Sequence, residues 1–250
     1  MGIALAAVTL VALAATAEAQ WMKLPTPGIP RHPDGTPNLN APPPRTADGK
    51  PDLSGIWRTP TGKYLYNLAA DGVEVLMQPW AERLYKERLE NHGRDRPSAA
   101  CLPHSVTDFD AHLTPRRIVQ TPELVVMLFE SYHSFRQIPT DGRALPIEPE
   151  PAWFGYSVGK WEGDTLVVDT IGNHEKTWLD DSGHPHSDAL RIIERFRRTA
   201  FGRMDVQITI DDPKAYVKPL KYTLKASLVP DEDLLEYFCA ENEKDVQHLQ

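Results

Sequence analysis

Two segments late in the chain alternate between apolar and polar residues with a period of two, as β-strands with one buried face do. Met204 to Ile210 places Met, Val and Ile on one face and Asp, Gln and Thr on the other, and Tyr222 to Val229 repeats this alternation. Apolar or β-branched runs bounded by turn residues predict further strands. These cover residues 52–58, 64–68, 117–121, 124–130, 134–139, 153–158, 165–170, 191–198 and 234–239.

One segment has the period of a helix instead. Gln78 to Asn91 carries an apolar stripe on one side and charged residues on the other, with Pro79 in its first turn and Gly93 after its end. After Pro115 the chain reads as consecutive hairpins without helices. We therefore predict a mainly β fold, an antiparallel up-and-down barrel with one mid-chain helix, and a β-sandwich is the alternative.

The two ends of the chain differ in composition. Residues 1–19 combine an apolar run with Ala17-Glu18-Ala19, a small-x-small cleavage pattern, and we expect a signal peptide. Residues 20–50 are rich in proline, which disfavours both helix and central strand, and predict an extended arm. Residues 51–250 are then a single barrel-like domain, and we expect a periplasmic or secreted protein.

The composition limits the class of partner. With 250 residues, 41% of them hydrophobic, the chain can form one sizeable core. The net charge of −8 argues against nucleic acid or an anionic membrane surface as the main partner. We expect no membrane span in the mature chain and a small molecule as ligand or substrate, whereas the oligomeric state stays open.

The chain has two cysteines, Cys101 and Cys239. Exported proteins meet an oxidising compartment in which such a pair usually forms a disulfide, and we predict one here. Two buried free thiols are the alternative.

Gly55-Ile56-Trp57 opens the first predicted strand after the arm. This motif resembles the Gly-x-Trp signature of the calycins, the lipocalin-type barrels. The resemblance implies a tryptophan that closes the barrel floor with a basic residue from a late strand packed on it. Arg195, Arg197 and Arg198 are the candidates for that residue.

The chain as a whole also resembles a family of secreted bacterial proteins of unknown function. The motifs that carry this resemblance lie at residues 48–58, 101–103, 136–143, 155–172, 178–180, 186–198 and 211–216. The resemblance implies export and one β-rich domain, and it implies no catalytic residues.

The polar loop at 171–189 holds three of the nine histidines. His174, His184 and His186 offer three ring nitrogens, a ligand set that suits zinc or iron and leaves an open position. Since 184–186 is His-Pro-His in a loop without a familiar ligand spacing, the alternative is a solvated loop whose histidines only form hydrogen bonds. We expect no cofactor, with a divalent metal as the alternative.

Metal-free acid–base chemistry is the other interpretation of this loop. His186 or His174 would transfer a proton and Asp180 would orient it, while Tyr156 or Arg143 would stabilise negative charge. Ser157 lies in a Gly-x-Ser-x-Gly pattern, but this pattern enters a β-hairpin and not a strand-to-helix turn, so we exclude it as a nucleophile.

Other residues are candidates for substrate contacts. Trp178 and Trp153 would form an apolar wall at the barrel mouth. His104 lies in the long segment 94–114, which also carries Asp108, Asp110 and His112 and is expected to be irregular. This segment is a candidate lid or second half-site, and the alternative is a loop whose carboxylates only bond its own backbone. Glu130 and Arg136 are predicted to contact a polar ligand or, with Glu194 and Arg195, to form buried ion pairs.

Three functional hypotheses follow. The first is an exported enzyme acting on a small organic molecule by acid–base chemistry at the barrel mouth, as a lyase, isomerase or hydrolase. The second is a non-catalytic small-molecule-binding barrel of the periplasm. The third is an interaction module of the cell envelope that uses the arm as its contact.

Overall fold

The computed structural model describes residues 25–239, which form one sheet of nine antiparallel strands. The strands are β1 (Gly55–Arg58), β2 (Arg116–Gln120), β3 (Leu124–Phe129), β4 (Phe135–Pro139), β5 (Tyr156–Glu162), β6 (Thr165–Ile171), β7 (Arg191–Ala200), β8 (Arg203–Asp211) and β9 (Leu220–Leu228). The sheet order is β4-β3-β2-β1-β9-β8-β7-β6-β5. Chain neighbours are therefore sheet neighbours almost throughout.

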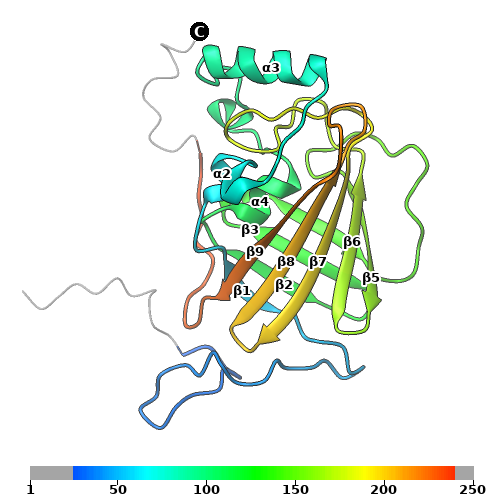
Figure 1. Cartoon of the computed structure of the whole chain (residues 1–250). Helices are drawn as coiled ribbons and strands as arrows, with labels where there is room; N and C mark the ends of the chain where they lie inside the picture. The colour runs from blue at the N-terminus through cyan, green and yellow to red at the C-terminus, as the bar shows by residue number, and fades with distance from the viewer. Residues whose placement is uncertain (1–24, 240–250) are drawn as a thin grey trace, which may run out of the picture.

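The sheet curls into a nearly closed barrel (Figure 1). The first and last strands pair, Trp57 with Leu228, and the two edge strands β4 and β5 face each other across a seam. Side chains bridge this seam, where Arg136 Nε donates to Ser157 Oγ at 3.1 Å. The predicted up-and-down antiparallel barrel is confirmed, and the sandwich does not form.

Helical segments gather at one end of the barrel (Figure 1). They are α2 (Lys63–Tyr66), α3 (Pro79–Glu90) and α4 (Val106–Ala111), with 3-10 turns η1 (Ala70–Gly72), η2 (Pro97–Ala100) and η3 (Ser131–His133). The predicted mid-chain helix is confirmed as α3. Among the described residues, no helix is both long and apolar enough to span a membrane.

Two predicted strands are wrong. The segment 64–68 begins in α2, which buries the consecutive residues Tyr64 and Leu65 on one side, whereas a strand would direct them to opposite faces. Residues 234–239 join no ladder, because both edges of the preceding strand β9 are already occupied by β1 and β8. The polar segment 94–114, expected to be irregular, contains the buried helix α4.

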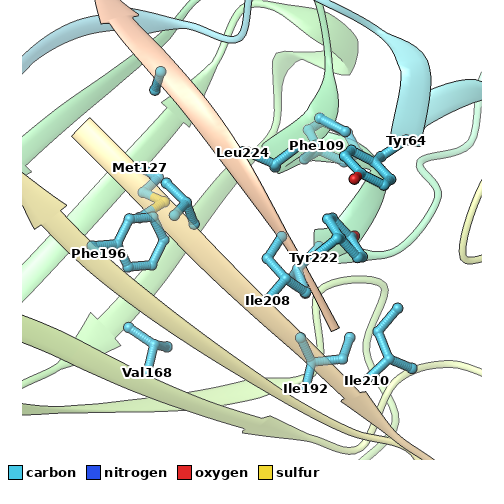
Figure 2. Packing of buried hydrophobic residues seen from close by; sticks show 14 of the residues in the cluster. Tyr64, Phe109, Met127, Val168, Ile192, Phe196, Ile208, Ile210, Tyr222 and Leu224 are labelled. Atoms are coloured by element: carbon cyan, nitrogen blue, oxygen red, sulfur yellow. The ribbon is translucent and has the colours of Figure 1, made fainter. Parts of the chain in front are cut away.

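The barrel interior follows from the alternation of each strand. On β8, Met204, Val206, Ile208 and Ile210 are buried while their neighbours face outward. Figure 2 shows Phe196 and Met127 packed together inside the barrel with Val168 and Ile208 nearby. One level of inward-facing positions is polar, and we call it the polar layer. It comprises Arg116, Arg136, Ser157, Thr170, Glu194 and Tyr222, with Asp110 of α4 beside it.

The barrel floor confirms the packing implied by the Gly-x-Trp motif. Trp57 is fully buried, and its indole Nε1 donates to the Leu53 carbonyl at 2.9 Å. The Arg198 guanidinium carbon lies 4.9 Å from the centre of the Trp57 rings. Arg198 also donates to the Asp52 carbonyl at 2.5 Å, so it ties strand β7 to the start of β1.

The proline-rich segment 25–50 contains no helix or strand and lies along the floor end of the barrel (Figure 1). Ion pairs hold it there, Arg31 with Asp231 at 2.5 Å and Arg45 with Asp164 at 2.8 Å. The Phe201 backbone N–H also donates to the Ala41 carbonyl at 2.7 Å. The predicted signal segment 1–19 lies outside the described residues.

Cys101 and Cys239 form the predicted disulfide, with their Cα atoms 5.7 Å apart. The bond joins the segment after η2 to the last described residue of the chain. Since residues 234–239 belong to no strand, the disulfide ties this segment, and not a strand, to the long loop.

Candidate functional site

Two neighbouring pockets at the helical end of the barrel share Trp153. The first, which we call the tryptophan cleft, has a volume of about 670 Å³ and lies between α3, the segment 94–102 and the polar loop. Its lining includes Trp153, Trp178 and the basic residues Arg88, Arg94, Arg96 and Lys176. Three carboxylates, Glu87, Asp95 and Glu175, line it as well, so four cations face three anions, and the cleft suits a small molecule with an apolar body and a polar or anionic group.

The second pocket, which we call the seam pocket, has a volume of about 540 Å³ and lies between β4 and β5. Four predicted site residues line it, Arg136, Arg143, Trp153 and Tyr156. Arg143 is half-exposed, and its Nε donates to Asp141 Oδ1 at 3.0 Å. Hydrogen bonding to Asp141 and to Tyr156 raises the pKa of Arg143, which stays charged.

Arg136 links the seam pocket to the barrel interior. Its Nη1 donates to Glu194 Oε1 at 2.7 Å, and its Nη2 donates to Thr170 Oγ1 at 2.8 Å and to Glu194 Oε2. Arg136 and Glu194 are 3% and 0% exposed, so this is the buried ion pair that the sequence offered as one alternative. Because Nε bonds Ser157, all three guanidinium nitrogens already have acceptors within the protein.

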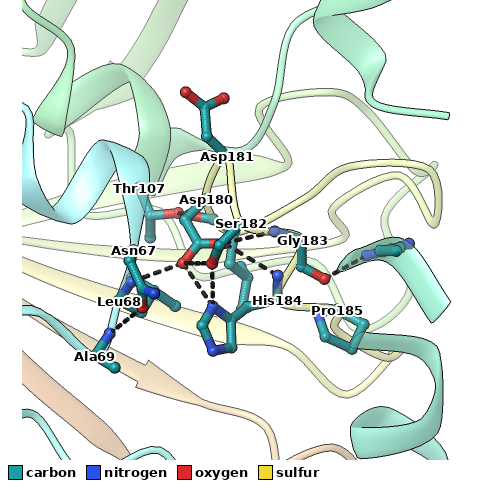
Figure 3. A network of polar contacts seen from close by, with 12 residues as sticks. Asn67, Leu68, Ala69, Thr107, Asp180, Asp181, Ser182, Gly183, His184 and Pro185 are labelled. Carbon is teal, nitrogen blue, oxygen red and sulfur yellow. Dashed lines mark hydrogen bonds and ion pairs between the residues drawn. The ribbon is translucent and has the colours of Figure 1, made fainter. Parts of the chain in front are cut away.

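Asp180 holds the polar loop together (Figure 3). Its carboxylate accepts from Nδ1 of His184 at 2.5 Å and from the backbone N–H groups of Leu68 at 2.6 Å and Gly183 at 3.0 Å. Both His184 and Asp180 are buried, and the His184 ring stacks on Tyr85 with centres 4.3 Å apart. Asp180 thus orients His184, whereas we expected it to orient His186 or His174.

The other two histidines of the loop are bonded elsewhere. His186 bonds Thr177 Oγ1 through Nε2 at 2.6 Å and the Ser187 carbonyl through Nδ1 at 2.9 Å, and burial lowers the pKa of its ring. His174 accepts the Lys176 N–H at 3.2 Å and stacks on Trp153. His174, His184 and His186 therefore do not gather their nitrogens into one ligand set in residues 25–239.

A different group brings a histidine and two carboxylates together. His104 Nδ1 lies 3.3 Å from Asp108 Oδ1 and 3.8 Å from Asp181 Oδ1. The first two residues are buried, and Asp181 is 24% exposed in its side chain. Figure 3 shows Asp181 pointing away from the Asp180 network. We call these three residues the Asp–His–Asp group.

The surroundings of Asp181 shift the pKa of its carboxyl upward. Burial and, next, the negative charge of Asp108 raise this pKa, and the charges of His104 and Arg96 oppose the rise. Arg96 lines the tryptophan cleft and places Nη1 3.7 Å from Asp181 Oδ1. Asp181 is therefore the partly exposed carboxyl of the Asp–His–Asp group, and it lies next to the cleft.

The same three residues are close enough for a divalent cation, since their ligand atoms lie within 4.8 Å of one another. However, His104 Nε2 accepts the Ser98 backbone N–H at 3.3 Å. In a neutral imidazole the proton is then on Nδ1, the nitrogen that would have to bind the metal. Nδ1 itself and Asp108 Oδ1 have no hydrogen-bond partner within residues 25–239, so the Ser98 hydrogen bond fixes the ring while Nδ1 faces the two carboxylates.

The remaining residues predicted to contact a substrate, Trp178 and Glu130, offer little exposed surface to the two pockets. Trp178 is 2% exposed, more buried than its charged neighbours in sequence suggest, and Arg88 stacks over it at 4.3 Å. Glu130 accepts the Leu235 N–H at 3.0 Å and belongs to neither pocket lining. Arg88 and Arg96 were absent from the predicted site. Ser105-x-x-Asp108 matches a helix-start pattern, which would have placed Asp108 in a first helical turn directly after His104.

Comparison with models of protein families, with curated proteins and with solved structures finds no match for this chain.

The Asp180 network leads to a stability prediction. Replacing Asp180 with Asn puts an amide NH2 among the Leu68 and Gly183 N–H donors, and we expect a loss of about 2 kcal/mol in the free energy of unfolding. Urea denaturation measures this change. Asp188→Asn is the control, because Asp188 is an exposed residue of the same loop that pairs with Lys214. Equal stabilities of the two variants would contradict the anchoring role of Asp180.

Proposed function

We propose that the protein is an exported enzyme that acts on a small organic molecule by acid–base chemistry in the tryptophan cleft. One observation carries this proposal. The buried His104 directs Nδ1 toward two carboxylates, and one of them, Asp181, is partly exposed beside Arg96 of the cleft. Asp181 takes the proton-transfer role that the sequence suggested for His186, and the Asp–His–Asp group takes the place of Asp180 and its histidine.

In this proposal Asp181 is the general acid. A protonated Asp181 donates its proton to the substrate, and the resulting carboxylate lies 3.8 Å from Nδ1 of His104, whose N–H can stabilise its charge. The Ser98 backbone N–H, which donates to Nε2 at 3.3 Å, keeps the His104 ring in this orientation. The proton transfer is a step that lyases, isomerases and hydrolases share, so the reaction class is decided by the substrate.

The cleft would supply the binding energy. Trp153 and Trp178 form its aromatic walls, and Arg94 and Lys176 place positive charge at its rim. A ring-bearing anion would stack on the partly exposed Trp153 indole and place its charge at these cations, while Arg88 covers the buried Trp178. Export remains part of the proposal, supported by the disulfide and by the apolar run that opens the sequence.

Non-catalytic binding is the second candidate, and the seam pocket favours it. This pocket offers aromatic walls from Tyr132, Trp153 and Tyr156, while its buried cation Arg136 is already fully bonded within the protein. Such a pocket can hold a molecule without reacting groups.

The test is a substrate screen with matched variants. Aromatic esters, lactones, β-hydroxy acids and enolisable ketones are incubated with the protein, and products are followed by mass spectrometry. For any compound turned over, we expect Asp181→Asn and His104→Gln to lower kcat/KM about 10²–10⁴-fold, and Asp188→Asn to leave it unchanged. Turnover by Asp181→Asn at the wild-type rate would refute Asp181 as the acid.

The pH dependence of kcat/KM tests whether Asp181 acts as an acid. A general acid works in its protonated form, so kcat/KM should be constant at low pH and fall as pH rises through the raised pKa of Asp181. In Asp181→Asn this descending limb should be absent. A binding-only protein would show no turnover at any pH, although the same compounds would still quench its tryptophan fluorescence.

A further inference from the structure

The two buried cations of the polar layer differ in their partners. Arg116 and Arg136 supply these cations, and Glu194 and Asp110 supply two buried carboxyl groups. Arg136 and Glu194 neutralise each other as an ion pair. Arg116 forms no such pair within residues 25–239, and burial together with the negative charge of Glu194 raises the pKa of the nearby Asp110 carboxyl, which disfavours a charged partner there.

The Arg116 guanidinium also lacks hydrogen-bond acceptors. The side chain of Arg116 is 1% exposed, and its Nη1 donates to the Asp110 backbone carbonyl at 3.2 Å. Within residues 25–239, neither Nε nor Nη2 has a hydrogen-bond partner, and no carboxylate oxygen comes within the 4.0 Å of a salt bridge. An unpaired buried guanidinium is costly, so an acceptor is expected beside it.

A second unpartnered donor lies in the same layer. Tyr222 on β9 and Glu194 on β7 flank Ile208 at the same level of the sheet. The Tyr222 hydroxyl is buried and has no hydrogen-bond partner among the described residues. The layer therefore contains free donors on Arg116 and Tyr222, and its free acceptors belong to the Asp110 carboxyl.

We propose that Arg116 forms the centre of a buried binding site for one small monoanion, of the size of formate, nitrate or a halide. The Nε–H and Nη2–H of a guanidinium point the same way, and this fork matches an oxyanion with two oxygens. The bound anion neutralises Arg116 and accepts its two free hydrogens. This site lies inside the barrel and is independent of the function proposed for the tryptophan cleft.

Thermal unfolding of the mature protein tests the site. At constant ionic strength, sodium formate, nitrate and bromide should raise Tm in a saturable way, by about 5 °C at saturation, whereas sodium sulfate should not. Arg116→Leu should remove this anion dependence. Arg117→Leu is the control, because Arg117 is the next residue on β2 and pairs at the surface with Asp233. An identical response of Arg116→Leu and wild type would overturn the proposal.

Two further measurements keep the proposal testable if Arg116→Leu does not fold. In Asp110→Asn residue 110 is neutral, and the dependence of Tm on the anion should be retained. Loss of this dependence would mean that Asp110 itself balances the charge of Arg116. A crystal of the wild-type protein soaked in bromide should show anomalous density within hydrogen-bond distance of Arg116 Nε. Water alone at that position would overturn the site.

Discussion

Replacing Glu194 with alanine is expected to lower the free energy of unfolding by about 3–5 kcal/mol. Glu194 is 0% exposed and bonds Arg136 through both carboxylate oxygens. Its removal leaves a guanidinium inside the barrel with only the Ser157 and Thr170 hydroxyls as acceptors. Guanidinium chloride denaturation followed by tryptophan fluorescence measures the loss.

A surface pair gives the matched control. Arg195, the next residue on β7, pairs with Glu162 at 2.8 Å, and both side chains are well exposed. Glu162→Ala should cost less than about 1 kcal/mol, because solvent screens that pair. The double replacement Arg136→Met/Glu194→Leu should recover much of the stability, since it removes both buried charges. Equal losses for Glu194→Ala and Glu162→Ala would contradict a buried pair.

Removing the disulfide is expected to cost up to about 5 kcal/mol, the value of the chain-entropy model for a bond between residues 138 apart. The reason is that Cys101 and Cys239 close a loop containing most of the barrel, which restricts the unfolded chain strongly. The variant Cys101→Ser/Cys239→Ser and urea denaturation measure the change.

Reduction of the wild-type protein provides the control for this prediction. Wild type in excess dithiothreitol should unfold at the same urea concentration as the double variant, and the double variant itself should not respond to the reductant. A double variant as stable as the oxidised wild type would show that the bond does not restrict the unfolded state.

The sequence predicted those helices and strands that have one face exposed to solvent and one face buried. β8 and β9 alternate cleanly because only one side of each faces the core, and α3 has an exposed charged side. α4 gives no such pattern, because all six of its residues are buried. The floor was predictable for another reason, since the resemblance of Gly55-Ile56-Trp57 to the calycin motif implied a basic residue on Trp57, and Arg198 of β7 lies there.

The candidate site was harder to predict, because it depends on contacts between distant segments. The sequence drew attention to His186, whose two nitrogens turn out to bond Thr177 and Ser187. The Asp–His–Asp group joins the start of α4 to the polar loop, and no local pattern places His104 beside Asp181. Likewise, Arg136 and Glu194 were recognised as possible partners, but their common level inside the barrel follows from strand register.

The odd number of strands has a consequence for the barrel as a whole. When every neighbouring pair is antiparallel, nine strands leave the two edges, β4 and β5, running in the same direction. Parallel strands cannot be joined by a tight hairpin, so residues 140–155 must carry the chain back along the barrel before β5 can begin. The interruption of the barrel thus lies where its two parallel strands meet, and the seam pocket occupies it.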